Sequence, residues 1–138
     1  DYMGRISGPL MDRFDLRVEV PPVGYADLDL PASGDASATV ANRVRSARRR
    51  QEARFADVPG ARVNADLEGR LLEEVASPDT EGREFLSRVA ERFSLSARAY
   101  HRVMRVARTI ADLAGEDQVR RPHVAEAVSY RLMIGGQG

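Results

Sequence analysis

One stretch decides the fold of this chain: Leu95-Ser96-Ala97-Arg98-Ala99-Tyr100-His101-Arg102-Val103-Met104-Arg105-Val106-Ala107-Arg108-Thr109-Ile110-Ala111-Asp112-Leu113. Its apolar residues recur every three or four positions, which is the period of an α-helix that is buried on one side. Ser94 or Ser96 can serve as its N-cap, and Gly115 is a natural C-terminal stop. The apolar face comprises Tyr100, Met104, Ala107, Ile110, Ala111 and Ala114, and the basic face Arg98, Arg102 and Arg105, with Asp112 further along.

Helical periodicity continues on both sides of this stretch. A first helix is predicted over 39–55, a short one with Asn64 as N-cap, another after the turn at 77–80, and a last one opened by Pro122. Their expected buried residues are Val40, Val44, Ala47 and Phe55; Leu67, Leu71, Leu72 and Val75; Phe85, Leu86, Val89, Ala90 and Phe93; and Val124, Ala127, Val128 and Leu132. The sequence therefore predicts a bundle of four or five helices.

The N-terminal part has a different pattern. Leu16, Val18 and Val20 alternate with polar residues, which predicts a short β-strand that ends at the prolines of 21–22. We therefore expect a mainly α fold in four parts: a strand segment within 1–20, a Gly/Pro/Asp/Ser-rich linker over 21–38, a helical domain over 39–134, and a loose tail over 135–138.

Composition limits the classes of function. The 138 residues suffice for one modest core, and the formal net charge is zero, so any nucleic-acid contact requires a local patch. There is no cysteine, and His101 and His123 lack metal-ligand spacing, so we expect no metal site and a cytoplasmic protein. No apolar run approaches the roughly 20 residues that span a bilayer, so we expect no membrane contact.

The segment Ser7-Gly8-Pro9-Leu10-Met11-Asp12-Arg13-Phe14-Asp15-Leu16 sets an arginine between two acids. A turn at its start, with Leu10, Met11, Phe14 and Leu16 as apolar anchors, would hold Arg13 on a fixed base. A forked, permanently charged guanidinium suits phosphoryl transfer, although Arg13 could instead simply pair with Asp12 or Asp15.

This segment, the stretch 95–113 and the block 123–131 together resemble the magnesium-chelatase-like AAA+ ATPases of the ComM/YifB branch. The resemblance implies that Arg13 is an arginine finger acting in trans on a neighbour's γ-phosphate. It also implies that Arg98 is the sensor-2 arginine, with Arg102 as its competitor, and that 39–134 forms the AAA+ C-terminal lid. Whether Arg98 acts on its own subunit's nucleotide or on a neighbour's stays open.

The sequence also lacks parts that such an ATPase needs. It has no Gly-x-x-x-x-Gly-Lys-Ser/Thr motif, no lysine at all and no Walker B acid pair after an apolar strand. Together with the resemblance, these absences imply that the chain is a C-terminal portion that has no ATPase activity and no tightly bound cofactor by itself. ATP and Mg²⁺ would bind the full-length protein, whose AAA+ cores form a homo-oligomeric ring, expected to be a hexamer. The ring would perform DNA branch migration or act as a helicase in recombination or transformation.

Two other functions fit the same residues: the ATPase motor subunit of magnesium chelatase, and a non-catalytic helical interaction module.

The first predicted helix also has a dense basic patch with no interleaved aromatic residue for base stacking. The patch comprises Arg43, Arg45, Arg48, Arg49, Arg50 and Arg54. DNA is one candidate ligand, with Arg45, Arg48 and Arg49 as the contacts, and a solvated face or acids of a neighbouring subunit are the alternatives.

Overall fold

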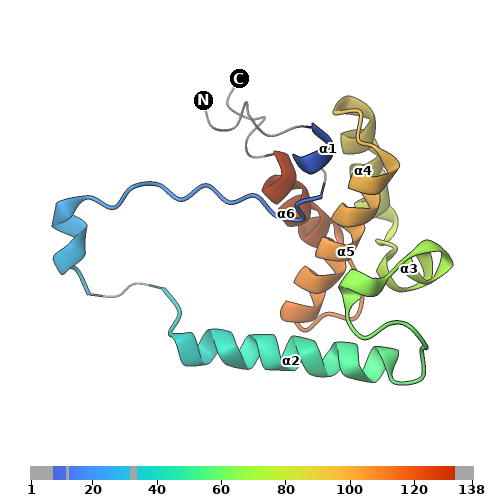
Figure 1. Cartoon of the computed structure of the whole chain (residues 1–138), viewed down its shortest axis with the longest axis horizontal. Helices are drawn as coiled ribbons and strands as arrows, with labels where there is room; N and C mark the ends of the chain where they lie inside the picture. The colour runs from blue at the N-terminus through green and yellow to red at the C-terminus, as the bar shows by residue number, and fades with distance from the viewer. Residues whose placement is uncertain (1–7, 12, 32–33, 133–138) are drawn as a thin grey trace.

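The predicted helical bundle is present and contains five helices in the described part of the chain (Figure 1). The computed structural model describes residues 8–11, 13–31 and 34–132, so the tail predicted over 135–138 lies outside the described residues. The bundle helices are α2 (Ser37–Phe55), α3 (Gly69–Ala76), α4 (Thr80–Arg92), α5 (Ala97–Leu113) and α6 (Arg121–Leu132). The short elements are α1 (Gly8–Met11) and the 3₁₀ turns η2 (Tyr25–Asp29) and η3 (Asn64–Asp66).

Helix α5 is the centre of the bundle, because it packs against α2, α3 and α6. Its start is fixed by Ser96, whose hydroxyl accepts a hydrogen bond from the backbone N–H of Ala99 at 3.1 Å. Gly115 follows its end with φ of 74°, a left-handed conformation that glycine adopts without a steric penalty. The fully buried residues of the predicted apolar face are Met104, Ala107 and Ala111, whereas Ala114 is exposed.

Helices α4 and α6 pack against each other, and a hydrogen bond also joins the turns that precede them. The Asp79 carboxylate caps α4 by accepting a hydrogen bond from the Gly82 N–H at 2.8 Å. The Asp79 N–H in turn donates to the carbonyl of Val119, just before α6, at 2.8 Å. The start signal predicted at 77–80 is therefore confirmed, and it joins two helices as well as opening one.

The predicted role of Asn64 is wrong. Asn64 lies in η3, five residues before α3, and its residue exposure is only 2%. Its side chain is used for contacts with α2 and α5, so it is not available to cap a helix. Helix α3 instead begins after Glu68 and buries Leu72 and Ala76.

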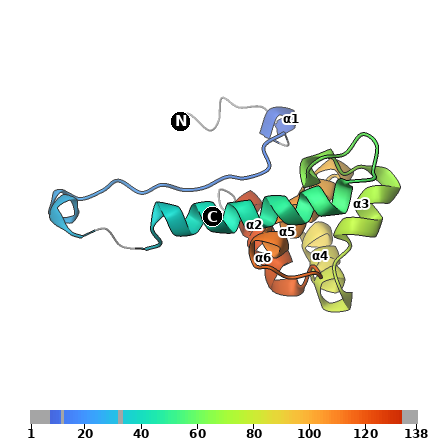
Figure 2. The same ribbon diagram turned by 90° about the horizontal axis from the view of Figure 1, so that it is seen from below.

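Three residues predicted to be buried are exposed: Val40 (45%), Val44 (44%) and Phe93 (51%). The N-terminal half of α2 extends beyond the other helices in both Figure 1 and Figure 2, so in the described part of the chain no neighbouring helix covers the first turns of α2, to which Val40 belongs. Ala47 and Phe55, further along α2, are buried as expected.

The strand predicted at residues 16–20 is not formed in the described part of the chain. A strand needs a ladder partner, and the helical bundle offers none. The segment instead runs away from the bundle as a long trace to η2, and Leu16, Val18 and Val20 are exposed (Figure 1). No helix among the described residues is long and apolar enough to cross a membrane.

Candidate phosphate-sensing site and basic helix

Arg98 lies in the first turn of α5 and its side chain is exposed. Backbone N–H groups at a helix start favour anions, so a guanidinium here adds to an anion-attracting end. Within the described residues, the Arg98 guanidinium makes no hydrogen bond or ion pair. It is therefore available to a ligand or to another polypeptide.

The other two arginines of the predicted basic face are engaged within the chain. The Arg102 side chain is 20% exposed, and its Nη1 lies 2.5 Å from Oδ1 of Asp15. Arg105 Nη1 donates to the carbonyl of Leu67 at 2.7 Å. The predicted basic face is thus not uniformly exposed to solvent: of its three arginines, Arg98 is the exposed one.

Arg13 follows α1 in a turn closed by its own N–H, which donates to the carbonyl of Leu10 at 3.0 Å. The side chain is exposed and has no polar partner in the described part of the chain. Of the two predicted acid partners, Asp15 is paired with Arg102 instead, and Asp12 lies outside the described residues.

The apolar anchoring predicted for this segment is wrong for three of its four residues: Leu10, Phe14 and Leu16 are 45%, 46% and 51% exposed. Polar contacts hold the segment on the bundle instead. Arg131 Nη1 donates to the carbonyl of Phe14 at 3.0 Å, and the N–H of Arg17 donates to the carbonyl of Tyr130 at 2.8 Å. A polar anchor of this kind leaves no hydrophobic signal in the sequence.

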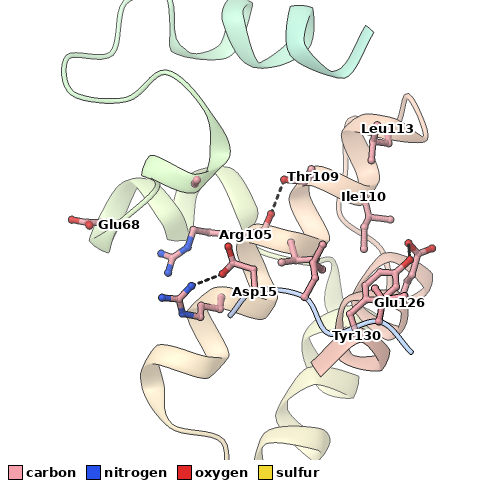
Figure 3. Close-up of a pocket in the computed structure, with 13 residues that line it drawn as sticks. Asp15, Glu68, Arg105, Thr109, Ile110, Leu113, Glu126 and Tyr130 are labelled. Atoms are coloured by element: carbon pink, nitrogen blue, oxygen red, sulfur yellow. Dashed lines mark hydrogen bonds and ion pairs between the residues drawn. The ribbon is translucent and has the colours of Figure 1, made fainter. Parts of the chain in front are cut away.

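A hollow of about 720 Å³ lies where this segment crosses α5 and α6 (Figure 3). Its apolar lining includes Val106, Ile110 and Leu113 of α5, while Glu126 and Tyr130 lie on the α6 side. The Tyr130 hydroxyl donates to Glu126 at 3.0 Å, and this hydrogen bond raises the pKa of the Tyr130 phenol. The described residues contain no group of three or more His, Cys, Asp or Glu that could hold a metal ion.

The basic patch on α2 is reduced by pairing within the chain. Arg43 pairs with Asp35, Arg45 donates to Asn42 at 2.8 Å, Arg50 pairs with Asp117 at 2.9 Å, and Arg54 pairs with Asp112 at 2.7 Å. Of the patch, Arg48 and Arg49 remain exposed without a polar partner among the described residues.

Sequence reasoning missed a buried polar cluster that attaches α2 to α5. Both Nη atoms of Arg54 donate to the Asp112 carboxylate, at 2.7 and 2.9 Å, and Asn64 Nδ2 donates to it at 2.8 Å. Arg108 Nη2 lies 3.1 Å from the same carboxylate, and Gln51 accepts from the Asn64 N–H at 2.9 Å. The available sequence signal was the spacing of Arg108 and Asp112, which lie four residues apart and therefore one turn apart on the same helix.

The cluster perturbs both charged groups on α5. Burial acts to raise the pKa of Asp112, but the hydrogen bonds from Arg54 and Asn64 and the charge of Arg108 outweigh it, so the pKa is lowered. Burial lowers the pKa of Arg108, which the charge of Asp112 partly opposes. The cluster is structural, because its members face one another rather than an open surface.

Comparison with known proteins agrees with the resemblance. A family model described as magnesium chelatase, subunit ChlI C-terminal, matches residues 34–131, and one described as magnesium chelatase, subunit ChlI, matches residues 1–28. Competence protein ComM of Haemophilus influenzae is 40% identical over 134 residues, which cover 96% of this chain and 25% of that protein. YifB of Salmonella typhimurium is 42% identical over 133 residues, again 96% of this chain and 25% of that protein.

The chain thus spans about a quarter of the length of these relatives. The two family models match in chain order and together cover both the Arg13 segment and the helical bundle. This chain belongs to the magnesium chelatase ChlI family, in the group that includes ComM and YifB.

Proposed function

We propose that this chain is the C-terminal part of a longer AAA+ ATPase and supplies two arginines to its nucleotide sites. Arg13 is the arginine finger and reaches the γ-phosphate bound to a neighbouring subunit. Arg98 is the sensor-2 residue and responds to the γ-phosphate of ATP, bound to its own subunit or to a neighbour, by changing the angle of the lid, α2 to α6. The partners of the chain are then its own AAA+ core and the adjacent subunits of a homo-oligomeric ring, expected to be a hexamer in the cytoplasm.

The observation that supports this proposal is the availability of both arginines. Arg13 and Arg98 are exposed and lack polar partners within the described residues, whereas Asp15 occupies Arg102, the competing sensor-2 candidate. The two segments also meet, because Asp15 lies two residues after Arg13 and Arg102 one turn after Arg98. Two uncommitted guanidinium groups on adjoining segments fit charge stabilisation at a phosphoryl group.

Bound ATP and Mg²⁺ would supply the transferable phosphoryl group and the divalent charge. This sequence has no Walker motif, and its described residues hold no metal-binding cluster, so both would be held chiefly by the rest of the protein. This chain's own contribution is positive charge: Arg13 would stabilise the transition state, and Arg98 would bind and sense the γ-phosphate.

The test is ATP hydrolysis by the full-length protein and its Arg13→Ala and Arg98→Ala variants. A finger supplied in trans contributes about 10³–10⁵ in rate, so Arg13→Ala should nearly abolish turnover. Arg88→Ala is the matched control, because Arg88 is an exposed arginine on α4 without a polar partner in the described residues. Ring assembly should be unchanged in all three variants.

We further propose that the ring acts on DNA, in branch migration during recombination or transformation. Arg48 and Arg49 support this, because intrachain pairing leaves them as exposed charges on α2. DNA-stimulated ATPase activity of the full-length protein is the expected result. ATPase activity that responds only to a porphyrin-inserting partner would favour the chelatase motor, and normal turnover in Arg13→Ala would favour a non-catalytic helical module.

A further inference from the structure

Three polar contacts fasten the Arg13 segment to the lid. The Asp15 carboxylate pairs with Arg102 of α5 at 2.5 Å, which is the dashed line that ends on Asp15 in Figure 3. Arg131 of α6 donates to the carbonyl of Phe14 at 3.0 Å, and the Tyr130 carbonyl accepts from the Arg17 N–H at 2.8 Å. The contacts therefore come from two helices, α5 and α6, and hold residues 14–17, which directly follow Arg13.

The lid side of this attachment is more buried than an ordinary surface ion pair. The Arg102 side chain is only 20% exposed, and Arg131 is 5% exposed. Two of the three contacts are made to main-chain atoms of residues 14–17, so they fix the path of the backbone. Asp15 supplies the third contact through a side chain that is itself 52% exposed.

We propose that Asp15 and Arg102 are positioning residues that couple the lid to the arginine finger. This inference rests on the proposed role of Arg13. We call the Asp15–Arg102 ion pair the clamp, because it holds the Arg13 segment on the lid. Arg98 and Arg102 lie four residues apart on α5, so one helix carries both the phosphate sensor and the lid side of the clamp. A change of lid angle that follows phosphate sensing at Arg98 is then transmitted through Arg102 and Asp15 to Arg13, which acts on the nucleotide of the neighbouring subunit.

The coupling has a kinetic consequence that a purely structural ion pair lacks. A finger stabilises charge in the transition state, so loss of its position lowers kcat and leaves the KM for ATP nearly unchanged. Misplacement of a reacting group by about 1 Å costs up to about 10²-fold in rate. Loss of an ion pair whose acid is half exposed should change the melting temperature little by comparison.

The experiment measures steady-state ATP hydrolysis and melting temperature of full-length protein carrying Asp15→Asn, Arg102→Gln, or the exchanged pair Asp15→Arg with Arg102→Asp. Asp15→Asn is the decisive variant, because a carboxylate is not expected to bind a phosphate directly. Glu74→Gln is the matched control, since it removes the acid of an exposed ion pair, with Arg70, on α3.

We expect Asp15→Asn and Arg102→Gln to lower kcat by about 10- to 100-fold, the exchanged pair to recover most of that loss, and Glu74→Gln to have no effect. Normal turnover in Asp15→Asn, with Arg13→Ala inactive, would overturn the clamp and leave the finger in place. A loss confined to Arg102→Gln and not repaired in the exchanged pair would also overturn it, because Arg102 would then act on phosphate directly. Normal turnover in Arg13→Ala would remove both the proposed function and the clamp.

Discussion

Arg54 and Asp112, 58 residues apart in the sequence, form a two-point ion pair in which both Nη atoms of Arg54 donate to the two carboxylate oxygens, at 2.7 and 2.9 Å. The Asp112 side chain is completely buried, whereas that of Arg54 is 19% exposed. This contact attaches the C-terminal half of α2 to α5 and so connects the basic helix to the rest of the bundle.

Replacement of Asp112 by alanine should destabilise the chain strongly. The change leaves the partly buried Arg54 and the buried Arg108 without a counter-charge, and removal of one partner of a buried pair costs about 3–5 kcal/mol. Urea denaturation followed by circular dichroism measures the loss. The control is Asp117→Ala, which breaks an ion pair whose acid side chain is 98% exposed and should cost about 0–1 kcal/mol. Equal effects of the two changes would contradict the structural role of the cluster.

The Asp112 carboxylate should make the free energy of unfolding depend on pH. The pKa of Asp112 in the folded chain lies below its ordinary value of 3.8, so its contribution is fully present above that value and is lost as the pH falls through the lower, folded pKa. The free energy of unfolding should therefore decline below about pH 4, as the unfolded chain takes up the proton first. Urea denaturation measured from pH 7 to pH 3 tests this. In the Asp112→Asn variant, the free energy of unfolding should decline less between pH 4 and pH 3 than in the unchanged chain. An equal decline in that variant would mean that other carboxylates cause the loss of stability at low pH.

The helices could be predicted from sequence because their signals are local. Ser96, Gly115 and Asp79 set helix limits through contacts within a few residues, and the structure confirms each of them. Periodicity also identified the core residues Val124, Ala127 and Val128 of α6. In α5 it identified Met104, Ala107 and Ala111, but it missed Ala99 and Val103 and wrongly included Ala114.

Features that depend on distant partners could not be predicted in the same way. An apolar side chain such as Val40 reveals a face that could be buried, but not whether a neighbouring helix is there to bury it. Asn64 was expected to be a cap because that is its commonest local role, whereas its actual partners lie 10 and 48 residues away. In the candidate site, sequence could not separate Arg98 from Arg102, since the difference between them is the contact of Arg102 with Asp15, 87 residues earlier.

Gly82→Ala should destabilise the chain although alanine favours helix. A Cβ at this position would lie 2.8 Å from the Cβ of Pro78 and 3.3 Å from the backbone nitrogen of Arg121. Alanine gains about 1 kcal/mol in helix propensity, but overpacking of a close contact costs about 1–3 kcal/mol. We expect a lower melting temperature, with Ser87→Ala on the exposed side of α4 as the control that does not lower it. A higher melting temperature in Gly82→Ala would mean that α4 and α6 can move apart enough to accommodate the added Cβ at little cost.

Arg48 and Arg49 should account for the salt dependence of DNA binding, if α2 contacts DNA. Each phosphate contact that is lost reduces the slope of log affinity against log salt concentration by about one, uniformly across sequences. The Arg48→Ala, Arg49→Ala double variant of the full-length protein should therefore bind duplex DNA more weakly and with a slope smaller by about two. The Arg83→Ala, Arg88→Ala double variant changes the net charge equally but removes exposed arginines of α4, and it should keep the original slope. If both double variants reduced the slope alike, the effect would come from overall charge, and α2 would not be a DNA-binding surface.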